Sequence, residues 1–234
     1  FRSPHHTSTM AAMVGGGKPI KPGEITLAHH GVLFLDELPE FQRPVLNALR
    51  EPLETREIAI ARASEQVSYP ASFQLIAAMN PCPCGHFGNS QHSCQCSAEH
   101  IRRYSQKISG PLLDRFDLHL ALQPTAIGLI TSTSGALTAD DSSSIRARVS
   151  QAHMLQQQRQ GSANSRLSGK ALQQLPIQTE ALQLLETLAT QLRLSARGLQ
   201  RTWRVARTIA DLAHSDNIEH THITEACSYR LKSN

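Results

Sequence analysis

Two adjacent carboxylates, Asp36 and Glu37, have the type and setting of residues that do chemistry. They follow an apolar run, Val32 to Leu35, that begins after Gly31. Such a run predicts a strand buried on both faces, typical of the centre of a parallel sheet. Ligands of open α/β sheets bind beyond the carboxyl ends of the strands, so the pair is predicted to lie at a nucleotide site. The alternative is a strand that leads into a solvated helix start.

Two Cys-x-Cys pairs, nine residues apart, hold four of the five cysteines: Cys82, Cys84, Cys94 and Cys96. Four thiolates are the number that a tetrahedral structural zinc site needs, so we predict Zn²⁺ in the loop 81–97. Free thiols are the alternative, and His86, His92 and His100 are possible substitute ligands. Clustered cysteines suit a reducing compartment better than scattered disulfides do, which predicts a cytoplasmic protein.

Composition is typical of a globular domain pair. The chain has 234 residues, of which 40% are hydrophobic, and a formal net charge of +4. No run approaches the roughly 20 apolar residues that span a bilayer, and no basic-then-apolar leader is present, so no membrane association is expected. From Ser143 onward, 12 Lys and Arg face 6 Asp and Glu, which makes a polyanionic partner possible without requiring one.

The elements that must position these residues can be followed along the first half of the chain. Helical spacing predicts a short helix within 5–14 and a longer one over 41–54, whereas 22–28 reads as an extended approach to the first strand. Alternation over 57–62 and 66–69 predicts a β-hairpin near Arg56 and Arg62. Further strands are predicted over 73–79, ending at Asn80, and over 118–122. A helix is predicted over 98–108.

The second half has helical periodicity throughout. Residues 124–141 are rich in Ser, Thr, Gly and Ala, so they are predicted to link a core of residues 1–123 to a helical domain of residues 142–234. Helices are predicted over 143–159, 168–175, 179–192, 195–214 and 221–231, each after a Ser or Thr cap candidate.

No phosphate-binding loop of the Walker A type is found in the sequence. Gly15-Gly16-Gly17-Lys18 has Ala12 and Pro19 where that pattern requires Gly and Ser or Thr. The chain alone is therefore expected not to hydrolyse ATP.

Longer stretches carry a family resemblance. The segments PGEITLAHHGVLFLDELPEF, NPCPCG and ISGPLLDRFDLHL resemble the magnesium-chelatase-like AAA+ ATPases of the ComM/YifB family over nearly the whole chain. The departure is the missing Walker A, which in that family lies upstream of Phe1, so the chain looks like a piece of a longer protein. The resemblance implies the carboxyl half of a AAA+ α/β core followed by a helical lid.

The resemblance also implies roles for single residues. Asp36 and Glu37 become the Walker B pair that holds Mg²⁺ and activates water, and Asn80 becomes sensor 1. Arg115 matches the arginine finger that reaches the neighbouring subunit's nucleotide, and Arg197 matches sensor 2. The segments 22–27 and 58–69 correspond to the helix-2 insert and the pre-sensor-1 hairpin, which point into the ring pore.

Plainer interpretations of the polar residues stay open. Asn80 could cap a turn before Pro81, and Arg115 could form a surface ion pair with Asp114 or Asp117. In the predicted helix 195–214, four arginines cluster on one side: Arg197, Arg201, Arg204 and Arg207. A solvated basic face would explain part of this arginine stripe.

The implied function is an ATP-driven, ring-shaped DNA motor, a branch-migration helicase acting in natural transformation, working as a hexamer with ATP and Mg²⁺. Arg56 and Arg62 would contact DNA phosphates, with the cysteine loop and the basic lid as secondary surfaces. Two alternatives are the motor subunit of a metal chelatase and a zinc-dependent binding module without an ATPase role.

Overall fold

The computed structural model describes residues 1–62, 65–89, 91–122 and 141–230, with the side chains of Arg62 and Glu65 left aside. The chain forms two compact units, Phe1–Phe116 and Asp117–Asn234. The predicted linker 124–141 lies, except for Asp141, outside the described residues. Among the described helices, none is long and apolar enough to cross a membrane.

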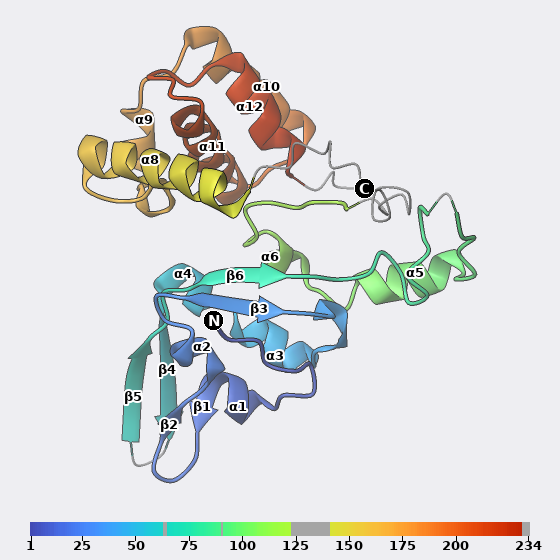
Figure 1. Cartoon of the computed structure of the whole chain (residues 1–234). Helices are drawn as coiled ribbons and strands as arrows, with labels where there is room; N and C mark the ends of the chain where they lie inside the picture. Colours follow the sequence, from blue (N-terminus) through green and yellow to red (C-terminus); the bar gives the residue numbers. More distant parts are fainter. Residues whose placement is uncertain (63–64, 90, 123–140, 231–234) are drawn as a thin grey trace. The chain divides into compact units, whose positions relative to one another are not determined.

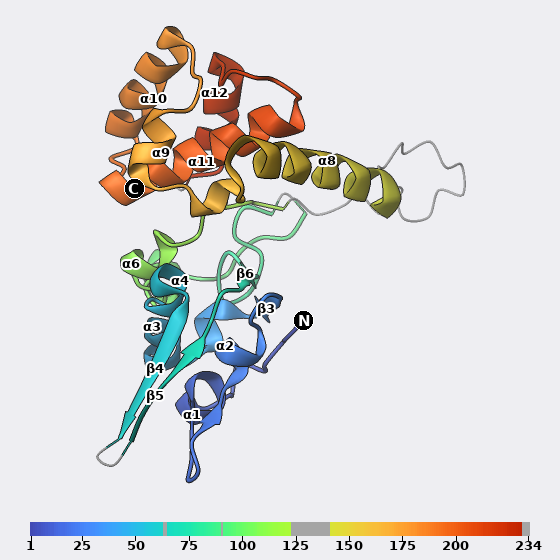
Figure 2. The same cartoon turned by 90° about the vertical axis from the view of Figure 1, so that its left-hand side faces the viewer.

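A parallel strand pair organises the first unit. Strand β3 (Val32–Leu35) pairs with β6 (Gln74–Ala77) in the register Val32 to Gln74 and Leu35 to Ala77, and Figures 1 and 2 show the two side by side. Both strands therefore end at the same edge. The mixed α/β class with a parallel sheet is confirmed.

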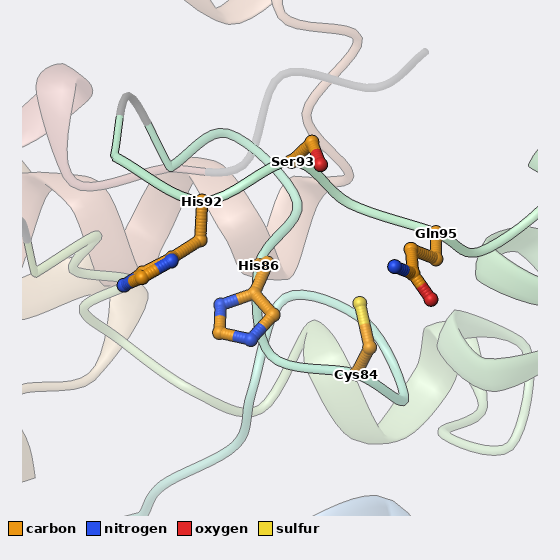
Figure 3. A pocket seen from close by; sticks show the side chains of 5 residues that line it. All are labelled: Cys84, His86, His92, Ser93 and Gln95. Atoms are coloured by element: carbon orange, nitrogen blue, oxygen red, sulfur yellow. The ribbon is translucent and has the colours of Figure 1, made fainter.

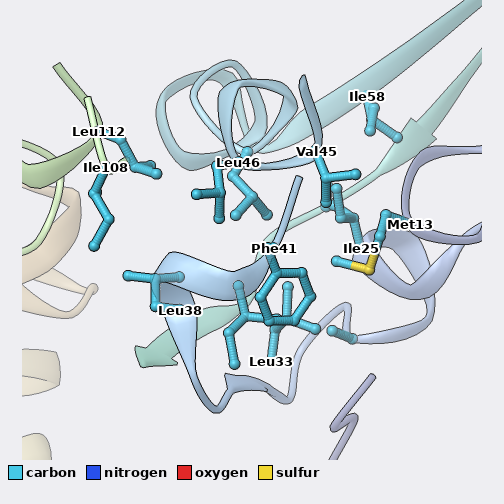
Figure 4. Packing of buried hydrophobic residues seen from close by; sticks show 14 residues of the cluster. Met13, Ile25, Leu33, Leu38, Phe41, Val45, Leu46, Ile58, Ile108 and Leu112 are labelled. Atoms are coloured by element: carbon cyan, nitrogen blue, oxygen red, sulfur yellow. The ribbon is translucent and has the colours of Figure 1, made fainter. Parts of the chain in front are cut away.

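One face of β3 forms the core, and the expectation of burial on both faces is wrong for the described residues. Leu33 and Leu35 are fully buried, whereas Val32 and Phe34 are only partly buried. Strand β6 is also half exposed, with Ile76 42% accessible. A strand that is buried on both faces needs a layer on each, and the described core includes Leu33 and Leu35 but neither Val32 nor Phe34. Figure 4 shows the packing of this core.

The region predicted as one helix over 41–54 contains two short helices, with a 3-10 turn just before it. The 3-10 turn η1 (Leu38–Glu40) precedes α3 (Arg43–Ala48) and α4 (Pro52–Thr55). Pro52 lacks an N–H and its ring would clash with the preceding turn, so the helix ends before it and a new one starts there. Val45, Leu46 and Leu49 still reach the core together with Leu33 and Leu35, as the helical spacing predicts.

The glycine run forms a tight hairpin. Strand β1 (Gly15–Gly16) follows α1 (Met10–Val14) and pairs antiparallel with β2 (Lys21–Pro22). Gly15 has φ +110°, and a Cβ there would lie 2.5 Å from the Lys21 carbonyl oxygen, so the turn requires glycine. The segment after it, predicted as extended, forms α2 (Glu24–Leu27), which buries Ile25 against the core.

The predicted β-hairpin is confirmed. Strands β4 (Glu57–Arg62) and β5 (Glu65–Pro70) pair antiparallel, and the pair projects from the rest of the unit in Figures 1 and 2. Ile58 and Ile60 are buried, while Ala59 and Ala61, which alternate with them, are exposed, and this is the period-two pattern seen in the sequence.

The cysteine loop leads into α5 (Ala98–Ser105), and α6 (Gly110–Leu113) follows. The third strand predicted over 118–122 is wrong: this segment has no regular secondary structure, and Leu118, Leu120 and Leu122 are 49%, 67% and 90% exposed. A strand needs a ladder partner, and none of the described strands lies beside it. The His119 N–H instead donates to the Tyr229 carbonyl at 2.8 Å.

The second unit is helical, as predicted. Its helices are α8 (Ser142–Gln160), α9 (Gly169–Gln173), α10 (Thr179–Gln191), α11 (Ala196–Leu212) and α12 (His220–Ser228), with the 3-10 turn η2 (Asn164–Arg166) between α8 and α9. Ser168 and Ser195 cap α9 and α11 through their side chains, as predicted. The predicted Ser or Thr cap is wrong for the other three helices, because Asp141 caps α8, Gln178 precedes α10 without a side-chain cap, and Glu219 caps α12.

Candidate functional site

The carboxylate pair follows β3 directly. Asp36 Oδ1 accepts a hydrogen bond from the Glu37 N–H at 2.8 Å, and Glu37 adopts a left-handed backbone conformation with φ 50°. This conformation is uncommon for a residue with a side chain and clusters at functional sites. Both side chains are exposed at the carboxyl edge of the sheet, which is where ligands of open α/β sheets bind.

Asn80 lies at the same edge. It follows β6, and the two strand ends are joined because the Leu38 N–H donates to the Ala78 carbonyl at 3.0 Å. The parallel register thus brings Asp36, Glu37 and Asn80 to one edge, as the sequence predicts from two strands that end in polar residues. Carboxylate and amide oxygens suit a hard cation such as Mg²⁺ and a positioned water.

Arg115 is held inside the first unit. Its side chain is 11% exposed and forms an ion pair with Glu54 at 2.8 Å, and its Nε donates to the Arg50 carbonyl at 2.9 Å. Spacing in the sequence did not point to Glu54, because Glu54 lies on α4 and Arg115 lies in the turn after α6, far along the chain. The arginine-finger role that the resemblance implies would require the guanidinium to leave this pair.

The arginines of α11 are not one solvated face. Arg197 is exposed in the first turn, but Arg201 pairs with Asp117 at 2.8 Å and Arg204 donates twice to the Leu167 carbonyl. Arg207 is 1% exposed. Helical spacing correctly predicts the side of the helix on which these arginines lie. It does not predict that other segments of this unit cover Arg201, Arg204 and Arg207.

Arg207 belongs to a buried polar cluster around Asp211. Arg207 Nε and Arg159 Nη1 donate to Asp211 Oδ1 at 3.0 and 2.6 Å, and Asn164 Nδ2 donates to Asp211 Oδ2 at 2.7 Å. Arg207 also donates to the carbonyls of Ser215 and Asp216. This cluster joins α8, η2, α11 and the turn after α11, so its arginines stabilise the helical unit.

The four clustered cysteines come together as predicted. Cys82, Cys84 and Cys94 have sulfur atoms 3.4 to 3.7 Å apart, and with Cys96 all four sulfurs lie within 4.8 Å of one another. Four sulfurs bound at about 2.3 Å to one tetrahedral ion would lie about 3.8 Å apart, so the donor set fits zinc. The cluster consists of cysteines alone.

Backbone amides support the cluster. The N–H groups of His86 and Gln95 donate to Cys84, and together with the neighbouring thiols they outweigh burial and lower the pKa of Cys84 to about 6. The Cys96 N–H lowers the pKa of Cys94, but burial and the neighbouring thiols outweigh this effect and raise it to about 12. Thiols this close resist joint deprotonation unless a cation offsets their charge.

A pocket of about 380 Å³ adjoins this cluster. Cys84, His86, His92, Ser93 and Gln95 line it, and Figure 3 shows their side chains around the opening. The rings of His86 and His92 lie 5.2 Å apart, between centroids. Both histidines are exposed, which leaves the two rings available at the surface beside the thiols.

A family model described as magnesium chelatase, subunit ChlI, matches residues 1–128, and its C-terminal counterpart matches residues 139–230. The chain belongs to the magnesium chelatase ChlI family. The predicted membership is thereby confirmed, and the helical second unit agrees with the C-terminal model of this family.

Two curated relatives match nearly the whole chain. The chain is 46% identical over 231 residues to the uncharacterized protein YifB of Salmonella typhimurium and 43% identical to the competence protein ComM of Haemophilus influenzae. Each match covers 98% of this chain and 45% of the relative, so the chain spans less than half of their length. A shorter similarity, 29% over 103 residues, covers 44% of this chain and 11% of the DNA replication licensing factor Mcm6 of Drosophila melanogaster.

Proposed function

We propose that the full-length protein is an ATP-driven motor that works on DNA as a ring of six copies, a branch-migration helicase acting in natural transformation. The observation that carries the proposal is the convergence of Asp36, Glu37 and Asn80 at one edge of the β3–β6 pair. Membership of the chelatase family supports ATP and Mg²⁺ as cofactors.

Each residue at this edge has a proposed task. Asp36 would hold Mg²⁺, which offsets charge on the phosphates, Glu37 would take the proton of the attacking water, and Asn80 would orient that water. Arg115 and Arg197 would contact the phosphates. Since the described residues contain no phosphate cradle, we expect the 234-residue chain alone not to hydrolyse ATP, and the experiments below use the full-length protein.

DNA as the partner is supported by two observations. The relatives include a protein named for competence and another named for DNA replication. The β4–β5 hairpin carries arginines, with Arg56 exposed at its base and Arg62 at the far end of β4. Arg62 lies six positions after Arg56, which is about 20 Å along an extended strand, so the two would form separate phosphate contacts rather than one cluster.

Replacing Arg56 and Arg62 by alanine in the full-length protein is expected to weaken DNA binding and DNA-stimulated hydrolysis, with basal hydrolysis unchanged. Released counterions supply much of the binding free energy, so the slope of log affinity against log salt should decrease by about 0.7 to 0.9 per lost phosphate contact. Fluorescence anisotropy with oligonucleotides measures the affinity and its dependence on salt. A matched control is Arg102→Ala, which removes one exposed arginine from α5. Unchanged affinity in the double variant would remove the hairpin from the DNA path.

Arg115 is proposed to act on the nucleotide of the neighbouring subunit. Mixing full-length Arg115→Ala and Glu37→Gln subunits should restore part of the activity that each variant lacks, because mixed interfaces can hold one intact Arg115 and one intact Glu37. The ATPase rate across mixing ratios measures this. Glu54→Gln is the control, since it breaks the ion pair and leaves Arg115 in place. Mixed rings that assemble without any recovery would assign Arg115 to the Glu54 pair alone.

The cysteine cluster is proposed to bind one structural Zn²⁺ per chain through Cys82, Cys84, Cys94 and Cys96. Elemental analysis of protein purified under reducing conditions should find about one zinc, and Cys94→Ser should lower that content. Chelation should expose the loop to proteolysis before the rest of the fold, because the ion's binding free energy orders this segment. Protein that contains no zinc and keeps a protected loop would favour free thiols.

The family description favours one other function, the motor subunit of a metal chelatase. That reaction needs no cysteine module in the motor, so the Cys₄ cluster weighs against it. The two functions differ in what stimulates ATP hydrolysis. DNA should raise the rate of the full-length protein, whereas a chelatase motor should respond to its partner subunits and tetrapyrrole instead.

A further inference from the structure

Two histidines of the cysteine loop, His86 and His92, have no task in the Cys₄ cluster or in the proposed ATPase. Their rings lie 5.2 Å apart between centroids, with planes at 48°, and Figure 3 shows both at the pocket of about 380 Å³. Both residues are exposed. Among the residues that the structure describes, none forms a hydrogen bond with a ring nitrogen of either histidine. These nitrogens are therefore open to a ligand from solvent.

An asparagine of the loop brings the two histidines together, although they lie six positions apart in the chain. The Asn89 N–H donates to the His86 carbonyl at 3.0 Å, and Asn89 Oδ1 accepts a hydrogen bond from the His92 N–H at 3.3 Å. The Phe87 N–H donates to Cys82 Sγ at 3.3 Å, so the same turn is tied to the cysteine cluster. Hydrogen bonds of the loop backbone thus set the distance between the two rings.

This distance is that of two imidazoles bound to one tetrahedral ion. Zinc binds histidine nitrogen at about 2.0–2.1 Å, and a tetrahedral angle at the ion then places the two ring centroids about 5 Å apart. The centroids of His86 and His92 lie 5.2 Å apart, in agreement with that value. The two rings therefore have the spacing of a metal-binding pair.

The groups around the pocket favour a transition-metal cation. Imidazole nitrogen suits zinc, copper and nickel, whereas Mg²⁺ and Ca²⁺ take oxygen ligands. Ser93 and Gln95 line the same pocket, and their polar side chains can hold water molecules that complete the coordination of the ion. Charge acts in the same direction, because four thiolates around one zinc ion keep a net negative charge, and Cys84 of that cluster also lines the pocket.

We infer that His86 and His92 bind a second zinc ion beside the proposed zinc of the Cys₄ cluster. This ion has two imidazole ligands and water in its remaining positions. Such a site is open to solvent, whereas four cysteines close theirs, so the second ion exchanges readily while the cluster zinc stays bound. The site takes part in no step of the proposed ATPase, and its occupancy is measured without nucleotide or DNA.

The test uses the full-length protein, purified under reducing conditions, with Zn²⁺ alone as the probe. Elemental analysis counts the zinc held before titration, and isothermal titration calorimetry counts the ions that bind in addition. The variants are His86→Ala and His92→Ala, in which only an exposed side chain is lost. His100→Ala is the matched control, because it removes an exposed histidine from α5, the helix that follows the loop.

Wild type and His100→Ala should bind one Zn²⁺ beyond the cluster's ion, and His86→Ala and His92→Ala should lose this binding. All four proteins should hold the same amount of zinc before titration. Co²⁺ added to the zinc-loaded wild type should give the weak absorption of a site with nitrogen and oxygen ligands. The intense sulfur-to-metal band that cobalt gives with thiolate ligands should be absent, which distinguishes binding at the histidines from exchange into the cluster.

Three results would overturn the inference. The first is wild type that binds no zinc beyond the cluster's ion, and the second is additional zinc that binds equally well to both histidine variants. The third is a lower zinc content of these variants before titration, which would make the histidines ligands of the first ion.

Failure of the proposed Cys₄ zinc site is a separate result, because wild type would then hold no zinc before titration. The histidine pair is in that case titrated in a Cys94→Ser/Cys96→Ser background, which breaks up the set of four thiols. One Zn²⁺ should still bind there and should be lost in the histidine variants. Zinc binding that did not depend on the two histidines in this background would likewise overturn the inference.

Discussion

Glu37→Gln in the full-length protein is expected to lower ATP turnover at least about 100-fold, because a positioned general base contributes about 10²- to 10⁴-fold to a rate. Glutamine keeps the size of the side chain, but its amide cannot take the proton of the attacking water. Asp36 stays in place to hold Mg²⁺, so the affinity for nucleotide should remain near that of wild type.

Steady-state hydrolysis and binding of a fluorescent ATP analogue separate the two effects. Glu40→Gln provides a control in the same loop, since Glu40 is an exposed carboxylate that pairs with Lys107 at 3.1 Å. That control should keep normal turnover. If Glu37→Gln retained more than about a tenth of the wild-type rate, the base would have to be another group, and Glu37 would lose its assigned task.

The candidate site could be predicted where local sequence and topology coincide. Two apolar runs that end in Asp36-Glu37 and in Asn80 meet at one edge because parallel strands in register share their carboxyl ends. The cysteines were predictable for a similar reason. Each Cys-x-Cys pair brings its two sulfurs together locally, so a single loop closure completes the set of four.

Contacts between distant segments could not be predicted from the sequence. Arg115 and Glu54 are 61 positions apart, and His6 and Glu37 are 31 apart, with no periodicity that links them. The helical pattern of α11 likewise predicts the side of the helix on which Arg207 lies, but not which segments cover this side chain. Only the packing of α8 and η2 shows that this arginine is buried.

Two parts of the strand prediction, the burial of Val32–Leu35 on both faces and the strand over 118–122, failed for a related reason. An apolar run shows that a segment favours burial, but not whether a neighbour covers it. Only one face of Val32–Leu35 is fully covered, and residues 118–122 have no partner strand among the described residues. The hydrophobic pattern therefore predicted which segments favour a strand. Pairing with a neighbouring strand and cover by other elements determined which segments form one.

The buried Asp211 cluster leads to the largest expected effect on stability. Replacing Asp211 by alanine should lower the free energy of unfolding of the helical unit by about 3–5 kcal/mol, because it leaves the 1% exposed guanidinium of Arg207 without its carboxylate. The Asn164 amide would lose an acceptor at the same time. Urea unfolding followed by circular dichroism measures the change. Glu186→Gln, which alters an exposed carboxylate on α10, should shift the midpoint little.

The same cluster predicts how stability depends on pH. Burial raises the pKa of Asp211, but hydrogen bonds from Arg159 and Asn164 and the charge of Arg207 outweigh it and hold the pKa below its usual value. A carboxyl with a lowered pKa in the folded state stabilises the fold above its unfolded pKa of about 3.9, and this contribution is lost as the pH falls through the folded value. The difference in unfolding free energy between wild type and Asp211→Asn should therefore be full at neutral pH and should shrink below about pH 4. A difference that stayed constant from pH 7 to pH 3 would mean that Asp211 contributes through packing rather than through its charge, since packing does not change with protonation.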